Sequence, residues 1–299
     1  MIFIKKPIFI GCATALATPF DNSGEVDYSA LARLIDFQAE GGADAIVLCA
    51  TTGECVTLSD SEFEQVVDFG VRYTAGRMPV LAGTGRNSTE KSLHLSKIAE
   101  NCGVQGLLMV NPYYNKSTQK GIIEHYTYIA DRVSTPIILY NVPSRTGMSI
   151  APATYAQLSK HPMIYGTKEA SGDISHIAHA VALCEDDFIF YSGNDDQVVP
   201  ICALGGRGVI STSANIAPDK MSALCKACNK GDFICAATLQ LNLLPLIDSL
   251  FAETNPIPLK AALELAGLCT SKVRLPLTAP SEQTIQKLKN VLAQLDILQ

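Results

Sequence analysis

The sequence predicts an α/β protein whose body is a (β/α)8 TIM barrel, with helices appended after the last strand. Two observations predict this fold. Short apolar runs recur eight times at fairly even intervals, and segments with helical periodicity lie between them. The runs are continuous and not alternating, which is typical of strands buried on both faces of a sheet. With 299 residues, of which 47% are hydrophobic, the chain can bury a large core in one domain.

The strands are expected at the apolar, β-branched stretches. They are residues 8–16, 45–50, 79–84, 106–110, 136–142, 163–168, 188–193 and 208–212. After the last of them no further strand pattern occurs, and the chain reads as helical from residue 218 to its end. We therefore expect a catalytic barrel over residues 1–220 and a C-terminal helical region over residues 221–299 that packs on it.

Helices are expected between these strands, over residues 27–42, 58–76, 87–103, 117–133, 151–162 and 173–186. In the first of them, Leu31, Leu34 and Ile35 recur at helical spacing, and Gly41 supplies a C-terminal stop. The second begins at Ser59, with Glu62 three residues later, which is the pattern of a capping box.

The alternative to a barrel is a doubly wound open sheet, whose usual mark is a Gly-x-Gly-x-x-Gly loop after a strand. The stretch GTGRNS supplies Gly83 and Gly85 but has Ser88 where the third glycine would stand. The motif is therefore incomplete, and the barrel without a dinucleotide is the preferred interpretation.

The charge pattern argues against a nucleic-acid partner. The formal net charge is −6, and no basic stripe of the kind that nucleic-acid-binding chains usually carry is present. The apolar stretch at the N-terminus is broken by Pro7 and is too short to span a membrane, and no other apolar run is expected to approach that length. These patterns favour a small-molecule function without a membrane partner.

The cysteines predict ordinary thiols. There are ten, irregularly spaced, and the nearest approach to a cluster is Cys225, Cys228 and Cys235. A zinc site would need a fourth ligand at matching spacing, which the surrounding sequence does not offer. Free thiols throughout are typical of a reducing compartment, so we expect a cytoplasmic protein.

Candidate site residues lie where the strands end, because a barrel of this kind places its chemistry at the C-terminal ends of its strands. These ends carry Thr51 and Thr52, then Tyr140 with Arg145 in the loop after it, and finally Lys168. Taken alone, each has an ordinary interpretation as a turn residue, a strand-end aromatic or a solvated charge. Together they bring an amine, a phenol, paired hydroxyls and a guanidinium to one face, with no histidine and no obvious metal cluster.

This set of side chains suits amine catalysis. A lysine amine among apolar strands has a depressed pKa, so that part of it is neutral and nucleophilic, and Lys168 can form a Schiff base with a ketone. Tyr140 is the candidate proton shuttle. The hydroxyls of Thr51 and Thr52 can hold one carboxylate, and Arg145 can hold a second. No metal and no separate cofactor is expected, because the lysine itself activates the carbonyl group.

Several motifs in order resemble one family. The stretches ATTGE, AGTG, NPYYN, YNVPSRTG, GTKEASG and SGND, with NPIPLK near Pro256, are similar to those of the dihydrodipicolinate synthase family, within the pyruvate-dependent class I aldolase-like lyases. The resemblance runs almost from end to end. It implies the condensation of pyruvate with L-aspartate-4-semialdehyde, through a lysine Schiff base, to give 4-hydroxy-tetrahydrodipicolinate in diaminopimelate and lysine biosynthesis.

The resemblance also implies the catalytic roles. Lys168 would form the Schiff base with pyruvate, and Thr51, Tyr140 and Tyr114 would form a proton relay. In that relay Tyr114 comes from a neighbouring subunit, so the resemblance implies a homo-oligomer; a tetramer built as a dimer of dimers is expected, and a dimer stays open as the alternative.

Further positions match substrate-binding residues of the family. Thr52 would hold the pyruvate carboxylate together with the adjacent threonine, and Arg145 would bind the carboxylate of the aldehyde. Gly193 and Ile210 match backbone positions that line the pocket. Glu169, next to the lysine, receives no role beyond charge balance or support of the site.

Two alternatives stay open. One is another pyruvate-dependent lyase of the same family, such as an N-acetylneuraminate lyase or a keto-deoxy sugar-acid aldolase; Thr51 and Arg145 favour the lysine-pathway reaction over these. Ala50 replaces the usual first glycine of its motif, a small change that we expect to be tolerated. The other alternative is a non-catalytic binding barrel, which the presence of the lysine and the tyrosine makes unattractive.

The positions that bind inhibitory lysine in some members of the family differ here. Asn87 matches, but Lys91 stands where those members have a glutamate, and Asp60 with Phe63 occupies positions where they often have histidines. A lysine side chain would repel a lysine ligand. We therefore expect weak inhibition by lysine or none.

Overall fold

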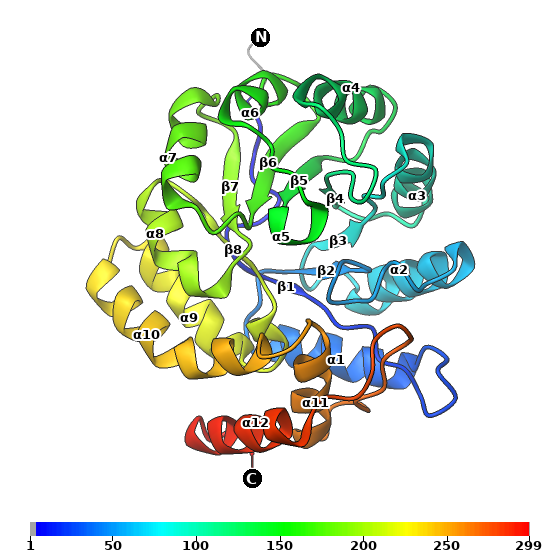
Figure 1. Cartoon of the computed structure of the whole chain (residues 1–299), viewed down its shortest axis with the longest axis vertical. Helices are drawn as coiled ribbons and strands as arrows, with labels where there is room; N and C mark the ends of the chain where they lie inside the picture. The colour runs from blue at the N-terminus through cyan, green and yellow to red at the C-terminus, as the bar shows by residue number, and fades with distance from the viewer. Residues whose placement is uncertain (1–3, 299) are drawn as a thin grey trace.

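Eight parallel strands close into a barrel with helices arranged around it (Figure 1). The computed structural model describes residues 4–298. The strands are β1 (Gly11–Ala15), β2 (Ala45–Leu48), β3 (Val80–Gly83), β4 (Gly106–Val110), β5 (Ile137–Asn141), β6 (Ile164–Glu169), β7 (Ile189–Ser192) and β8 (Gly208–Ser211). They pair in chain order, and β8 pairs with β1 to close the ring. The predicted (β/α)8 barrel is confirmed, and the open sheet is not formed.

The helices that surround the strands follow the expected segments. They are α1 (Tyr28–Glu40), α2 (Asp60–Thr74), α3 (Thr89–Asn101), α4 (Gln119–Ala130), α6 (Pro152–Leu158) and α7 (Ile174–Leu183). The expected capping box at α2 is present: the Ser59 hydroxyl accepts from the Glu62 backbone N–H, and the Glu62 carboxylate accepts from that of Ser59. The local pattern and the tertiary structure agree at these helices.

Successive side chains along each strand point alternately into two separate apolar cores. Ile138, Tyr140 and Val142 belong to the cluster inside the barrel, whereas Leu139 belongs to the larger cluster between the barrel and the helices. Successive side chains of a strand point to opposite faces, so both faces are buried in a closed barrel. This alternation decides which strand-end residues point into the site.

Two short helices were not expected from the sequence. They are α5 (Pro143–Thr146) and α8 (Val198–Ala203), each following the end of a strand. A four-residue and a six-residue helix are too short to display a periodic pattern, and both contain proline. Two 3₁₀ turns, η1 (Asp195–Gln197) and η2 (Ser213–Asn215), likewise follow β7 and β8.

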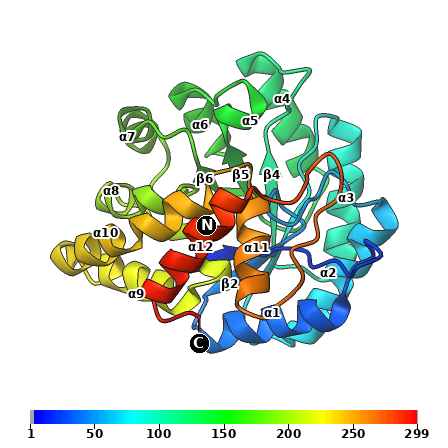
Figure 2. The ribbon, with the colours of Figure 1, turned by 60° about the horizontal axis from the view of Figure 1, so that its bottom comes forward.

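The chain ends in four helices, α9 (Pro218–Asn229), α10 (Phe233–Leu250), α11 (Ile257–Leu265) and α12 (Glu282–Gln294). The first of these contacts β1 and β8 and completes the helix layer of the barrel, so the expected boundary at residue 220 falls inside it. Figure 2 shows α11 and α12 together, with α10 beside them, and contacts join all three. We propose that the appended region begins after α9.

The α10 helix has an unexpectedly apolar sequence. Its 18 residues have a mean hydropathy of 1.5, which is enough by length and composition to cross a membrane, and only a third of them are buried. It packs against α8, α9 and α12 through a face that includes Leu243, Leu246 and Leu250. On its outer side Ile234 and Leu241 remain exposed.

Candidate active site

A cavity of about 200 Å³ lies at the C-terminal ends of the strands. Its lining includes the predicted residues Thr51, Thr52, Tyr140, Arg145, Lys168 and Gly193. These residues are spread over more than 140 positions of sequence, and the closure of the barrel brings them together. A second cavity of about 250 Å³ adjoins it and shares Thr51, Arg145 and Asn255 with it.

Lys168 points into this cavity from β6. Its side chain is 5% exposed, and its Nζ lies 4.6 Å from the centre of the Tyr140 ring. The strand register explains this proximity, because Tyr140 and Lys168 are direct partners across β5 and β6. Burial lowers the pKa of Lys168 to about 8, while the negative charge of Asp195 opposes that shift and the positive charge of Arg145 assists it. A substantial fraction of the Lys168 amine is therefore neutral at physiological pH.

Tyr140 remains a protonated phenol in the same pocket. Burial raises its pKa, and the positive charge of Arg145 and a side-chain hydrogen bond with Thr51 lower it in part. A phenol that lies beside a hydroxyl and an amine can pass a proton in either direction. Thr51 thus connects Tyr140 to the turn that follows β2.

The turn after β2 is held from two sides. Thr52 Oγ1 accepts from Asn255 Nδ2 at 3.0 Å, and the Gly53 carbonyl accepts from Thr18 Oγ1 at 2.8 Å. A Cβ on Gly53 would come within about 3.0–3.1 Å of Thr18 Oγ1 and the Leu16 carbonyl, so a side chain here would have to push the segment after β1 away by a few tenths of an ångström. The two threonines are therefore presented on a fixed turn.

Arg145 lies on α5, directly after β5. Its Nη2 donates to the Asn255 carbonyl at 3.1 Å, and its side chain lines both cavities. Asn255 thus contacts both a threonine of the β2 turn and the arginine of the β5 loop. Nothing in the sequence singles out Asn255 except its place in the stretch NPIPLK.

Gly193 and Ile210 occupy different surroundings. Gly193 lines the cavity, and a Cβ there would lie 2.7 Å from the Ala170 Cβ and 3.0 Å from Lys168 Cγ, so a side chain would displace Ala170 and crowd the lysine. Ile210 is fully buried in the core inside the barrel and is not among the residues that line the cavity. Of these two, only Gly193 borders the cavity.

Tyr114 lies apart from the other predicted residues. Its side chain is 93% exposed, and its φ of 68° is in the left-handed region. The adjacent Tyr113 lines the second cavity instead. Within one chain, therefore, the proposed relay contains Thr51 and Tyr140 but not Tyr114.

Two buried carboxylates near the site were not anticipated. Asp195 accepts from the backbone N–H groups of Thr212 and Ser213 at 3.1 and 2.7 Å, which ties the loop after β7 to the loop after β8. Glu54, in the β2 turn, pairs with Lys260 Nζ at 2.5 Å, and both side chains are almost completely buried. The glutamate in ATTGE was visible in the sequence, but its partner lies some 200 residues away.

The residues at the expected inhibitor positions contact one another. Lys91 Nζ contacts the Asp60 carboxylate, and His94 Nε2 lies 3.2 Å from the same group. Phe63 is 1% exposed and belongs to the core, so it presents nothing to a surface ligand. The Asp60 carboxylate is therefore already paired within the chain.

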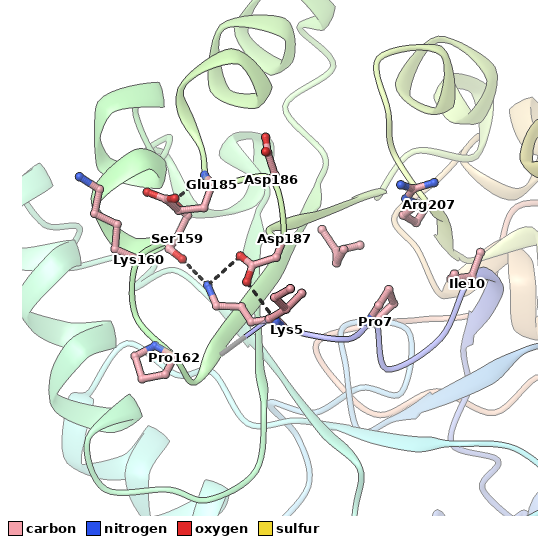
Figure 3. Close-up of a pocket in the computed structure, with 12 residues that line it drawn as sticks. Lys5, Pro7, Ile10, Ser159, Lys160, Pro162, Glu185, Asp186, Asp187 and Arg207 are labelled. Atoms are coloured by element: carbon pink, nitrogen blue, oxygen red, sulfur yellow. Dashed lines mark hydrogen bonds and ion pairs between the residues drawn. The ribbon is translucent and has the colours of Figure 1, made fainter. Parts of the chain in front are cut away.

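A larger cavity, of about 890 Å³, lies at the opposite end of the barrel (Figure 3). Its lining precedes the strands: Lys5 and Ile10 lie before β1, Ser159 before β6, and Asp187 before β7. Lys5 contacts the Ser159 carbonyl and lies 3.6 Å from Asp187, so its charge is compensated. Catalytic groups of barrel enzymes lie at the other end, and we do not assign the chemistry to this cavity.

The histidine, cysteine and carboxylate side chains of residues 4–298 form no group of three or more that could hold a metal ion. All ten cysteines are free thiols, including Cys225, Cys228 and Cys235.

Comparisons with known proteins agree with this geometry. Residues 8–295 match the Dihydrodipicolinate synthetase family. A 4-hydroxy-tetrahydrodipicolinate synthase of Caldicellulosiruptor saccharolyticus is 50% identical over 96% of this chain and 97% of its own length. The crystal structure of dihydrodipicolinate synthase from Thermotoga maritima has a TM-score of 0.96 and 42% identity, and the match covers 98% of this chain and 100% of that one. The chloride-inhibited dihydrodipicolinate synthase from Acinetobacter baumannii, solved in complex with pyruvate, has a TM-score of 0.95 and 40% identity, over 97% and 99% of the two chains. Because these similarities extend over nearly its whole length, the chain belongs to the dihydrodipicolinate synthetase family.

Proposed function

We propose that this protein is a Schiff-base-forming lyase that condenses pyruvate with L-aspartate-4-semialdehyde to give 4-hydroxy-tetrahydrodipicolinate, in diaminopimelate and lysine biosynthesis. The observation that carries the proposal is the buried amine of Lys168, with its pKa lowered to about 8, against the ring of Tyr140. Relatives that carry the name of this reaction, at close to half identity over the whole chain, support it.

The geometry supports the following sequence of steps. Neutral Lys168 Nζ attacks the ketone carbon of pyruvate, and loss of water gives an iminium. The iminium withdraws electrons, so the methyl group of pyruvate loses a proton and an enamine forms. The enamine carbon attacks the aldehyde, and the amino group of the second substrate displaces Lys168 as the ring closes. Tyr140 and Thr51 would carry the protons between these groups.

The charged and polar groups of the cavity suit two carboxylates. Thr51 and Thr52 present their hydroxyls on the fixed turn, which suits the carboxylate of pyruvate. Arg145, at the boundary between the two cavities, suits the carboxylate of the aldehyde. No other cofactor is proposed, because the covalent bond to Lys168 supplies the electron sink.

We infer further that the working unit is a homo-oligomer, in which Tyr114 reaches the site of a neighbouring subunit. The 93% exposure of this aromatic side chain supports an interface there. A tetramer built as a dimer of dimers needs a second interface, and the exposed Ile234 and Leu241 on α10 are candidates for it. The free thiols support a reducing, cytoplasmic location.

Borohydride trapping tests the proposal directly. Incubation with pyruvate followed by reduction should add the mass of pyruvate, less one water and plus two hydrogens, to the peptide that contains Lys168. The Lys168→Ala variant should form no adduct. Absence of an adduct on the native protein would overturn the mechanism.

A substrate comparison separates the proposed reaction from related lyases. The native enzyme should consume pyruvate with aspartate semialdehyde much faster than it cleaves N-acetylneuraminate or keto-deoxygluconate. A faster reaction with either sugar acid would assign the protein to that branch of the family, and an adduct without turnover on any substrate would favour a binding barrel.

A further inference from the structure

Directly behind Lys168 and Tyr140, on the other face of the same two strands, lies a buried polar pair. The register of β5 and β6 sets Tyr140 opposite Lys168 and, one residue on, Asn141 opposite Glu169. Since side chains alternate along a strand, the first pair points into the barrel and the second points to the helix layer. Asn141 is fully buried, and Glu169 is 1% exposed.

Every group that contacts the Glu169 carboxylate donates a hydrogen bond. Oε1 accepts from Asn141 Nδ2 at 3.0 Å and from the Ser171 backbone N–H at 2.8 Å. Oε2 accepts from the Tyr155 hydroxyl at 2.6 Å and from Asn141 Nδ2 at 3.1 Å. Burial and the neighbouring Glu169 raise the pKa of Tyr155 well above its usual value, so the phenol stays protonated and donates. A carboxylate only accepts, and an amide in its place would turn an N–H toward these donors.

Asn141 is oriented by further contacts. Its Oδ1 accepts from the Ile150 backbone N–H at 3.1 Å, so its Nδ2 is the atom that faces Ser149 Oγ and Glu169. The pair therefore joins β5, β6 and the segment before α6 in one fixed arrangement. Neither Asn141 nor Glu169 is among the residues that line the cavity.

We propose that Glu169 and Asn141 are positioning residues, which fix the ends of β5 and β6 so that the Lys168 amine and the Tyr140 phenol stay opposed in reactive geometry. This inference rests on the function proposed above. A buried carboxylate is costly, and an apolar pair would fill the same space at lower cost if packing were the only requirement. Amine addition, by contrast, is sensitive to displacements of about 1 Å, which can cost about a hundredfold in rate.

The test uses Glu169→Gln, Asn141→Asp and the double variant in the full-length protein. Glu169→Gln should slow the formation of the borohydride-trapped pyruvate adduct and lower kcat by about tenfold or more, since its amide opposes the donors. KM for pyruvate should change less, because the turn with Thr51 and Thr52 is untouched. The double variant gives the new amide an acceptor on β5 but leaves the Ser171 backbone N–H or the Tyr155 hydroxyl facing an N–H, so its adduct formation and kcat should stay below those of the native protein. Glu124→Gln, an exposed change on α4, is the matched control.

Three outcomes would overturn either the proposed function or the positioning role. If native protein forms no adduct, the proposed function itself fails. If native protein forms the adduct and Glu169→Gln forms it equally fast with unchanged kcat, only the positioning role is overturned. A double variant with native adduct formation and native kcat would also overturn it. If Glu169→Gln does not fold, Tyr155→Phe is used instead, because it keeps the carboxylate and removes one donor. Unchanged adduct formation and kcat in Tyr155→Phe would contradict the proposal. A several-fold loss of both would support it.

Discussion

At the scale of single residues, the pKa of the Lys168 amine is set by opposing electrostatic effects. Burial and Arg145 favour the neutral amine that the proposed attack on the ketone requires, whereas Asp195 favours positive charge on the same nitrogen. The iminium of the proposed reaction would carry this positive charge, so a fixed carboxylate nearby would stabilise it. A pKa of about 8 is a compromise between a free nucleophile and a stabilised cation.

This pKa predicts a pH profile. At fixed, saturating pyruvate, the initial rate of adduct formation should rise about tenfold per pH unit below about 8 and level off above it. The direction follows because only the neutral amine attacks, and its proton leaves as the pH rises through the pKa. Quenching samples with borohydride between about pH 6 and pH 9 measures the profile. A flat profile would contradict a nucleophile with a pKa in this range.

Lysine should inhibit this enzyme weakly or not at all. The Asp60 carboxylate is occupied by Lys91 and His94, so it is not free to accept an incoming ammonium group. Initial rates measured with increasing L-lysine should fall little at about millimolar concentrations. Half-maximal inhibition at sub-millimolar lysine would refute this expectation.

At the scale of elements, the turn after β2 depends on the C-terminal region. The Glu54 carboxylate in this turn accepts from Lys260 Nζ of α11 and from the Arg274 backbone N–H at 2.9 Å. Glu54 itself has a φ of 52°, so the turn adopts a backbone conformation that few side chains prefer. The buried contacts compensate for that conformation and hold the two threonines of the turn.

Loss of the Lys260 ammonium group should therefore destabilise the folded protein. Lys260→Met leaves the Glu54 carboxylate buried without it and should lower the free energy of unfolding by about 3–5 kcal/mol, measured by urea denaturation. The double variant Glu54→Gln, Lys260→Met should lose less than Lys260→Met alone, because no charge is left unpaired. Lys272→Met, an exposed neighbour, should stay within about 0.5 kcal/mol of the native protein. Equal losses in the single and double variants would argue against an unpaired charge as the cause.

At the scale of the whole molecule, one chain holds an incomplete proposed relay. Thr51 and Tyr140 line the cavity, but Tyr114 projects into solvent from its strained position. If a neighbouring copy supplies this tyrosine, each site is built from two chains. Such an arrangement makes activity depend on assembly.

Mixing two inactive variants tests this arrangement. Lys168→Ala keeps Tyr114, and Tyr114→Phe keeps Lys168, so a mixed pair contains one site with both groups. After denaturation and joint refolding in equal amounts, we expect recovery of about a quarter of native activity, because half the pairs are mixed and each has one complete site. The variants refolded separately and then assayed together are the control. Full activity of Tyr114→Phe alone, or no recovery on joint refolding, would place Tyr114 outside the relay.

The sequence predicted the barrel and most of the cavity because both depend on local patterns. Each of the eight strands is a continuous apolar run, and the residues at their ends share one rim in any closed parallel barrel. Asn255 and Lys260 could not be found this way, since their contacts with Thr52 and Glu54 span more than 200 residues and leave no periodic signal. Glu169 was noticed in the sequence, but its role depends on a strand register and on Tyr155 of α6, neither of which the sequence displays.

The contacts between the β2 turn and α11 have a consequence for synthesis of the chain on the ribosome. All eight strands end by residue 211, so a nascent barrel can close before the C-terminal region of the protein has been completed. The β2 turn that carries Thr51 and Thr52, however, is fixed only when residues 255–274 have been translated and have docked. A ribosome-stalled intermediate should therefore be compact and resistant to proteolysis but inactive, and activity should appear only near the end of translation.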